Sequence, residues 1–247
     1  MSSEHHHDHH RDEPATLASR VPWGLVLSLI GIVAIAWQGA TGQLNLYIHP
    51  RYNTFTLVMI GLGLVGTAIA WTLRSRGAGG AGRWGAGAAA AAMVLALLVV
   101  PPATLSASSA QQRSTNTTDS GDVERLAGAD ASTFTLRDWS VLVTDPESAT
   151  THAGQSVKLV GFVAPVDGQH PDTFHLARFV ITCCTVDARP VVVPVALQGW
   201  AGKHKPDQWL EVSGRFMPAE QAPGGAVLVL QPTELKPIPR PSQPYEY

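Results

Sequence analysis

Residues 157–164, VKLVGFVA, decide the fold of the C-terminal half of this chain. They form a short β-type run broken by Gly161, and similar runs recur between turns rich in Gly, Pro and Asp. The other runs are residues 173–181, 190–198, 208–216 and 226–236. A glycine inside a run, as at 161 or 214, allows a bulge or sharp coiling. The pattern predicts five strands in an OB-like β-barrel, with an open β-sandwich as the alternative.

The sequence before the barrel divides into segments of different character. Residues 136–143 fit a short helix or an extra edge strand. Residues 106–128 are rich in Ser, Thr, Gln and Asn and have almost no large apolar side chains, so they cannot fold alone. We therefore predict four parts: a His-rich tail (1–20), a membrane domain (21–105), a polar linker (106–128) and a soluble β-domain (129–247).

Three apolar runs make up the predicted membrane domain. Residues 23–40 and 55–73 carry no charge over 18 and 19 residues, about the length that crosses a bilayer. A cleavable signal peptide is the alternative for the first run, but a second uncharged run follows at once. Residues 86–105 begin Ala-rich and end near Pro101-Pro102, and we expect a third span there. The predicted fold class is a membrane-anchored α plus all-β protein, with about three transmembrane helices before the barrel.

The arginine distribution predicts the orientation of these spans. Cytoplasmic flanks accumulate Lys and Arg. With the N-terminus inside, five arginines flank the spans on the inner side and two on the outer side: Arg11, Arg20, Arg74, Arg76 and Arg83 against Arg51 and Arg113. The β-domain is then extracytoplasmic and the His-rich tail cytoplasmic. If the third run does not span, the β-domain moves to the cytoplasm.

Cys183 and Cys184 are adjacent, and they are the only cysteines of the chain. Two neighbouring thiolates can ligate Zn²⁺ or another thiophilic ion such as Cu⁺, with Asp187, His175 or a partner residue completing the shell. Two other interpretations remain open. The pair can form a strained, reducible vicinal disulfide, or it can be two small residues that pack at the end of a strand.

Histidines suggest two further metal-competent features. Imidazoles in the N-terminal tail can bind a metal ion, and the tail could act as an arm that buffers or collects that ion. These are His5, His6, His7, His9 and His10. The alternative is that the segment is an affinity tag or a tail without function. The loop GQLNLYIHPRY (42–52) holds His49 near the membrane surface, either as part of ordinary interfacial anchoring or as a ligand on a permeation path.

Composition and motifs argue against two classes of function. From residue 129 onward the chain has 9 Lys and Arg against 12 Asp and Glu, a net charge of −3, whereas a nucleic-acid surface normally has a basic excess. Catalytic signatures such as GxSxG, HExxH or a Walker-type phosphate loop do not occur, and we expect no enzyme. The run of small residues at 77–82 follows an apolar span and is interpreted as a loop.

Several segments together resemble a known family. GQLNLYIHPRY after the first span, an apolar run ending in Pro-Pro, and then VKLVGFV, FHLARFVITCCTVDARPV and WLEVSGRF resemble the YcgQ-like family of bacterial membrane proteins. That family is described as the small subunit of a two-component permease. The resemblance spans about residues 21–247, and it implies a multi-span permease partner from a superfamily associated with metal or metalloid species.

The combined expectation is an accessory subunit that lies in membrane lipid, contacts a permease and assists transport of a metal ion, with zinc first. The substrate and the direction of transport do not follow from the resemblance. The alternative is a scaffolding or interaction module tethered to the membrane, without a metal, in which Cys183-Cys184 is structural or redox-active.

Overall fold

The computed structural model describes residues 23–72, 83–99, 104–113, 120–126, 128–166, 170–220 and 222–247. The chain forms two compact units. The helical unit contains the residues up to Thr41 and from Thr54 to Pro101, and the barrel unit contains Gly42–Asn53 and Pro102–Tyr247. The segment Gly42–Asn53, called the inter-helix segment below, is therefore separated in sequence from the rest of the barrel unit.

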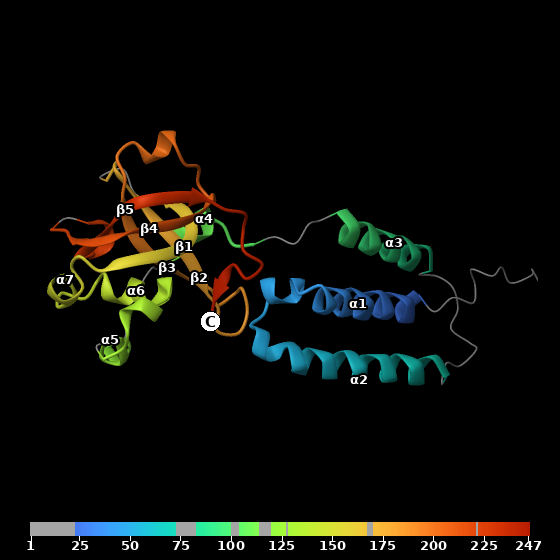
Figure 1. Ribbon diagram of the computed structural model, residues 1–247. Helices are drawn as coiled ribbons and strands as arrows, with labels where there is room; N and C mark the ends of the chain where they lie inside the picture. Colours follow the sequence, from blue (N-terminus) through green and yellow to red (C-terminus); the bar gives the residue numbers. More distant parts are fainter. Residues whose placement is uncertain are drawn as a thin grey trace, which may run out of the picture. The chain divides into compact units, whose positions relative to one another are not determined.

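The helical unit contains α1 (Trp23–Ala40), α2 (Asn53–Thr72) and α3 (Arg83–Val99) (Figure 1). The first two coincide with the first two predicted spans and are long and apolar enough to cross a membrane. None of their residues is buried. The apolar part of α3, Ala88–Leu97, is shorter than a full span.

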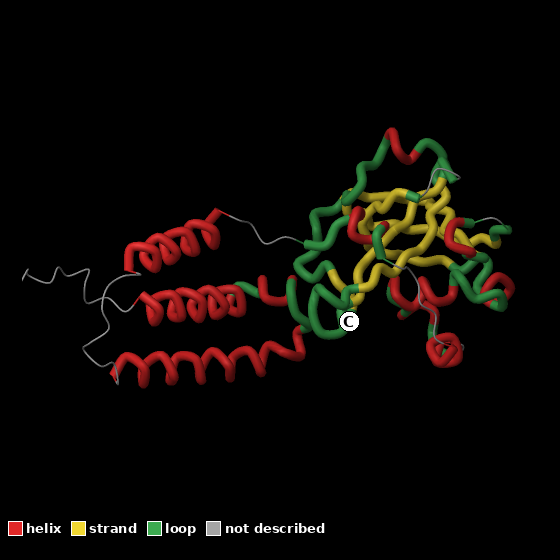
Figure 2. The backbone as a smooth tube through the Cα atoms, turned by 180° about the vertical axis from the view of Figure 1, so that it is seen from behind, coloured by secondary structure: helices red, strands yellow, loops and turns green. Residues whose placement is uncertain are grey.

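Five strands form a closed barrel in the C-terminal region, which confirms the number and positions of the predicted strands. The sheet runs in the order β1-β4-β5-β3-β2, and β2 pairs with β1 to close the ring. Figure 2 shows the strands of this region in yellow. Neighbours are antiparallel except β3 and β5, which are parallel. The closure excludes the open sandwich. The strands are β1 (Ser156–Pro165), β2 (Thr173–Val180), β3 (Arg189–Ala196), β4 (Trp209–Pro218) and β5 (Leu228–Pro237).

Two glycines make the closure possible. Strand β1 pairs with β4 over Ser156–Phe162 and with β2 over Phe162–Pro165, so it changes partner beside Gly161. A Cβ on Gly161 would lie 2.8 Å from a backbone oxygen of β2. The register of β4 against β5 shifts between Ser213 and Gly214, and a Cβ on Gly214 would collide with the backbone of β5. The bulge expected from the sequence is therefore present at Gly214.

The helix α6 (Leu136–Leu142) packs against the barrel and completes its core. The side chain of Thr135 accepts a hydrogen bond from the Asp138 amide while Asp138 accepts from the Thr135 amide, a capping box that starts a helix. Trp139 is 1% exposed and its ring lies 4.4 Å from that of Phe216. The ambiguous segment before the barrel is thus a helix.

Parts of the predicted linker also fold, because the barrel supplies the surface that they lack. Helix α4 (Ala107–Gln111) buries Ala107 and Ala110 in a second apolar cluster with Phe162 and Phe179, on β1 and β2. Helix α5 (Ser120–Leu126) buries Leu126 in the main core. The remaining short helices are α7 (Ser148–Thr151) and 3-10 turns at Gln43–Leu46, Pro50–Tyr52, Ala131–Thr133, Trp200–Gly202 and Pro223–Gly225.

The last strand, β6 (Tyr245–Glu246), was not expected from the sequence. It runs parallel to the end of β2, with Phe179 opposite Tyr245 and Val180 opposite Glu246. Tyr245 is buried in the second apolar cluster. The C-terminal residues therefore lie directly beside the point where β2 leads into the cysteine pair.

Candidate functional site

The loop between β2 and β3, residues 181–188, carries both cysteines and is called the dithiol loop below. Cys183 is exposed, Cys184 is partly exposed, and both are free thiols. Their Sγ atoms lie 3.5 Å apart. Val186, at 84% exposure, lies on the same loop. The two sulfur atoms are therefore neighbours at the surface of the barrel unit.

Asp187 stabilises the dithiol loop through hydrogen bonds with the loop's own backbone. Its carboxylate accepts hydrogen bonds from the amides of Thr182 at 3.1 Å and Cys183 at 2.7 Å, and its own amide donates to the Cys184 carbonyl. Burial raises the pKa of Asp187, but hydrogen bonds from the Cys183 thiol and from backbone amides outweigh it, so the pKa lies below its ordinary value. Asp187 is consequently ionised, and its carboxylate accepts several hydrogen bonds from groups of its own loop.

The same contact sets the protonation of Cys183. The hydrogen bond from its thiol to the Asp187 carboxylate, followed by the contact with Cys184, raises the pKa of Cys183 to about 12. The carboxylate stabilises the protonated thiol and opposes a second negative charge beside it. At neutral pH Cys183 is a thiol, and a metal ion that binds it must displace a proton.

The dithiol loop pairs with the inter-helix segment. Ile48 and Cys184 form an isolated antiparallel bridge. Two backbone hydrogen bonds flank the bridge: the His49 N–H donates to the Cys183 carbonyl at 3.0 Å, and the Thr185 N–H donates to the Tyr47 carbonyl at 2.9 Å. In addition, Arg51 Nη2 donates to the Thr182 carbonyl at 2.8 Å. Arg51 and Thr182 are 131 residues apart in the chain, so the pairing joins two segments that are distant in sequence.

Arg113 holds the other flank of the dithiol loop. Its Nη1 donates to the carbonyls of Ala188 and Thr185. Because Arg113 follows α4, a residue of the predicted linker takes part in fixing the loop. Both flanks are therefore bound by arginines that come from outside the strands.

His49 lies beside the cysteines. Its Nδ1 accepts a hydrogen bond from the Arg51 amide at 3.1 Å, which leaves Nε2 as the other ring nitrogen. Its ring lies 4.6 Å from that of Tyr247. Desolvation lowers the pKa of His49, the Arg51 charge lowers it further, and Asp187 opposes both effects. Sequence reasoning noticed His49 but gave no reason to join it to Cys183, since no local pattern connects the two segments.

The structure brings together only some of the predicted site residues. Cys183, Cys184 and Asp187 share the loop. His175 lies within β2, opposite Ala164 and Pro194, and eight residues before Cys183. At about 3.3 Å per strand residue, it is not brought to the thiols. His5, His6, His7, His9 and His10 lie outside the described residues. Within the described ranges, no group of three or more His, Cys, Asp or Glu side chains is placed to hold a metal ion.

Comparison with known protein families finds a match to the C-terminal part of the chain. Residues 130–247, which include α6, the whole barrel and the dithiol loop, match the model of the DUF1980 C-terminal domain. This domain belongs to uncharacterised bacterial membrane-associated proteins. No curated protein matches the chain. The chain is thus similar, over residues 130–247, to a domain of bacterial membrane-associated proteins.

Proposed function

We propose that this protein is the accessory subunit of a multi-span permease, and that its dithiol loop receives a thiophilic metal ion, zinc first, on the extracytoplasmic side. The observation that carries the proposal is the pairing of the dithiol loop with the inter-helix segment. That segment joins α1 directly to α2, so the two thiols are tethered through a stretch of 12 residues to both apolar helices.

The pairing supports three spans. If α1 and α2 both cross the membrane, the inter-helix segment is on one side and the residues after Thr72 are on the other. The barrel unit contains the inter-helix segment, so the chain must cross once more between Thr72 and the barrel. The region of α3 is the candidate for this crossing. The arginine-rich flanks, which include Arg74, Arg76 and Arg83, favour the cytoplasm for the opposite side.

The spacing of the two sulfur atoms is compatible with a shared metal ion. Two thiolates at about 2.3 Å from a tetrahedral zinc ion are separated by roughly 3.8 Å. The observed 3.5 Å is close to that edge. The two free thiols therefore already have a spacing that two ligands of one ion can adopt.

Exposure of the pair supports a site that transfers its ion. Cys183 is open to solvent and Cys184 is partly so. Two protein thiolates fill half of a tetrahedral shell, and the other positions face outward, where water or a ligand of the permease can bind. On this account Asp187 organises the loop, and His49 supplies an imidazole on the paired segment. The His-rich tail then buffers the same ion on the cytoplasmic side.

We also propose that the barrel is OB-like. A closed five-stranded barrel with Greek-key connections and one parallel neighbour pair, β3 with β5, supports this assignment. The assignment does not imply nucleic-acid binding, because the unit has a net charge of −3 from residue 129 onward.

Metal binding by the purified full chain in detergent tests the proposal. Zinc should bind under reducing conditions, and the double variant Cys183→Ser and Cys184→Ser should lose that binding. The control is His204→Gln, which alters an imidazole outside the dithiol loop. Unchanged zinc affinity in the double variant would eliminate the dithiol as the site.

Elemental analysis of cells tests the transport role. Deletion of the gene should change cell-associated zinc, and copper and arsenic measured in the same samples identify other thiophilic cargo. A profile that stays unchanged under limitation and excess favours the rival function, a membrane-tethered scaffolding module. That rival is favoured by one observation: Cys184 also pairs through its backbone with Ile48, so the loop has a structural role.

A further inference from the structure

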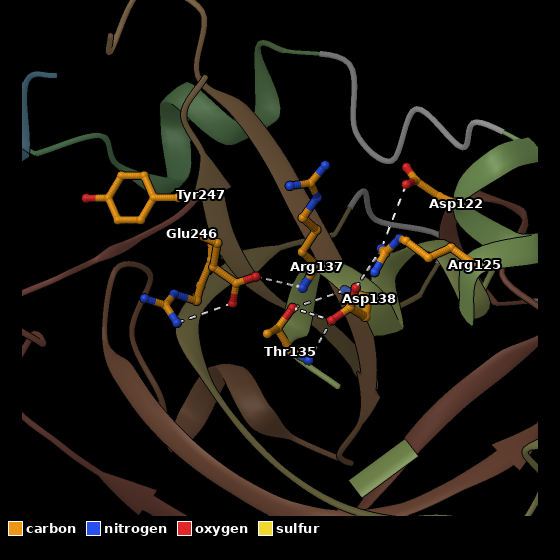
Figure 3. Close-up of a pocket in the computed structure, with 8 residues that line it drawn as sticks. Asp122, Arg125, Thr135, Arg137, Asp138, Glu246 and Tyr247 are labelled. Carbon is orange, nitrogen blue, oxygen red and sulfur yellow. Dashed lines mark hydrogen bonds and ion pairs between the residues drawn. The ribbon is translucent and has the colours of Figure 1, made fainter. Parts of the chain in front are cut away.

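A second polar site lies beside β6. It is a hollow of about 570 Å³, within the range of small-molecule pockets. It is lined by three arginines and three carboxylates from α5, α6, β2 and β6, by Thr135 at the N-cap of α6, and by Tyr247, which follows β6 (Figure 3). We call it the arginine hollow.

One wall of the arginine hollow is fixed by Arg178. Its guanidinium donates to the backbone carbonyls of Gln243 at 2.8 Å and Tyr245 at 3.2 Å, and it pairs with the Glu246 carboxylate at 3.2 Å. Glu246 is 9% exposed. This buried ion pair holds the C-terminal residues in place, and both of its charges are satisfied.

The opposite wall is fixed by Asp138 and Arg125. Asp138 accepts from the amide and hydroxyl of Thr135 and from Arg125 Nη2 at 3.1 Å. Asp122 lies 3.8 Å from the same guanidinium. The hydrogen bonds lower the pKa of Asp138 more than its burial raises it, so this carboxylate stays ionised. Two of the three arginines therefore already have anionic partners.

Arg137 is the exception. Its backbone N–H donates to Glu246 Oε2 at 2.9 Å, which fixes the position of its main chain. In the part of the chain that the structure describes, its guanidinium makes no hydrogen bond or ion pair. Figure 3 shows this side chain extending into the space between Tyr247 and Asp122, with no dashed line at its guanidinium. A planar fork of N–H donors without a protein partner thus lies at the hollow.

We propose that the arginine hollow binds a small carboxylic acid, whose carboxylate pairs with the guanidinium of Arg137 and whose body lies against the ring of Tyr247. A bidentate contact with a carboxylate uses the fork geometry of the free guanidinium. The lining side chains carry three positive and three negative charges, which cancel. The hollow therefore has no net charge to attract a ligand from a distance, and recognition depends on direct contacts. Asp122, Asp138 and Glu246 would repel a doubly charged phosphate more strongly than a singly charged carboxylate.

The side chain of Tyr247 is an uncharged aromatic wall of the arginine hollow. Desolvation and the neighbouring Tyr245 raise its pKa above the ordinary value, against a lowering effect of Arg178. The phenol therefore stays protonated and adds no negative charge to the hollow at neutral pH. The Tyr247 ring also contacts His49 of the inter-helix segment, with ring centroids 4.6 Å apart, so the hollow adjoins that segment. The test of this site nevertheless does not depend on metal binding.

Protection of Arg137 from phenylglyoxal tests the proposal in the full chain in detergent, with modification of each arginine followed by mass spectrometry. Benzoate should slow modification of Arg137, while its neutral analogue benzamide should not, and inorganic phosphate should protect less than benzoate does. Arg215, an exposed arginine on β4, is the internal control and should react equally in all samples. Absence of protection by benzoate, or equal protection by benzamide or phosphate, would overturn the proposal.

A binding measurement completes the test. Arg137→Gln removes the guanidinium but keeps the backbone contact with Glu246, so the fold should persist. It should weaken binding of labelled benzoate by about tenfold or more, as loss of a charge-assisted pair predicts. Arg215→Gln should bind as the unmodified chain does. Equal benzoate affinity in the two variants would contradict the assignment.

Discussion

Asp187 and Cys183 form the contact that determines the chemistry of the dithiol loop. The carboxylate holds the thiol proton and raises the pKa of Cys183 to about 12. Asp187→Asn removes the negative charge and should lower that pKa toward its ordinary value. Alkylation of Cys183 by iodoacetamide near pH 8 should then accelerate, about tenfold for each unit by which the pKa falls.

The alkylation rate is measured in a Cys184→Ser background, so that Cys183 is the only reactive thiol. Asp172→Asn is the matched control, because Asp172 also accepts a backbone amide, that of Gly199, but lies in another loop. An unchanged rate in Asp187→Asn would show that the carboxylate does not control the thiol.

Zinc affinity should depend steeply on pH for the same reason. A pKa above the ordinary value means that the neutral thiol is the stabilised form, whereas zinc requires the thiolate. Raising the pH therefore favours the complex, and the proton of Cys183 alone should contribute about a tenfold gain in apparent affinity per pH unit below pH 9. Competition titrations with a chelator at several pH values measure this slope, and a flat profile would be inconsistent with Cys183 as a ligand.

Single residues were only partly predictable from the sequence. Adjacent cysteines followed by an aspartate identified a loop with unusual chemistry, but they did not show that the aspartate would receive the amides of Thr182 and Cys183. His49 and Arg137 depend on contacts between segments distant in sequence. Their roles follow from tertiary packing, which leaves no local signal.

Among the elements, β4 depends most clearly on a residue without a side chain. Gly214→Ala would bring a Cβ against the backbone of β5, with Pro232 Cα at 2.9 Å. Backbone cannot move aside as a flexible side chain can, so the substitution should destabilise the barrel by about 1–3 kcal/mol. Gly202→Ala is the control, because a Cβ there meets nothing within 4 Å. Chemical unfolding of both variants, followed by Trp fluorescence, gives the comparison, and equal stability would contradict the steric argument.

The pairing of the inter-helix segment with the dithiol loop gives a second prediction at this scale. Arg51→Ala removes the hydrogen bond to the Thr182 carbonyl and should weaken the pairing. Amide exchange should accelerate at His49 and Thr185, whose N–H groups donate across the two segments. Arg215→Ala should leave both amides as protected as before. Exchange that stays slow in Arg51→Ala would show that this contact does not support the pairing.

The regular elements were more predictable than their partners. Each of the five barrel strands has its own β-type run with turn residues on both sides, so local sequence was sufficient. Helices α4 and α5 and strand β6 gain their burial only against the finished barrel, as Ala107, Leu126 and Tyr245 show. A polar, Ser-rich segment therefore looked like a linker in the sequence.

For the whole molecule, the account requires an odd number of membrane crossings before the barrel. The barrel unit includes the inter-helix segment between α1 and α2, and this fact supports a crossing near α3 although its apolar part is short. The backbone pairing bears on the number of crossings, whereas only the arginine count bears on which side of the membrane the barrel faces. That count depended on accepting the third run as a span.

Labelling of two engineered cysteines with a membrane-impermeant maleimide tests this claim most directly. In a Cys183→Ser, Cys184→Ser background, Val186→Cys places a thiol on the dithiol loop at a position that is 84% exposed, and Ser75→Cys places one between α2 and α3. The account predicts that the thiol at 186 is labelled in intact cells and the thiol at 75 only after the membrane is permeabilised. Labelling of both from the same side, or of position 75 alone from outside, would contradict it.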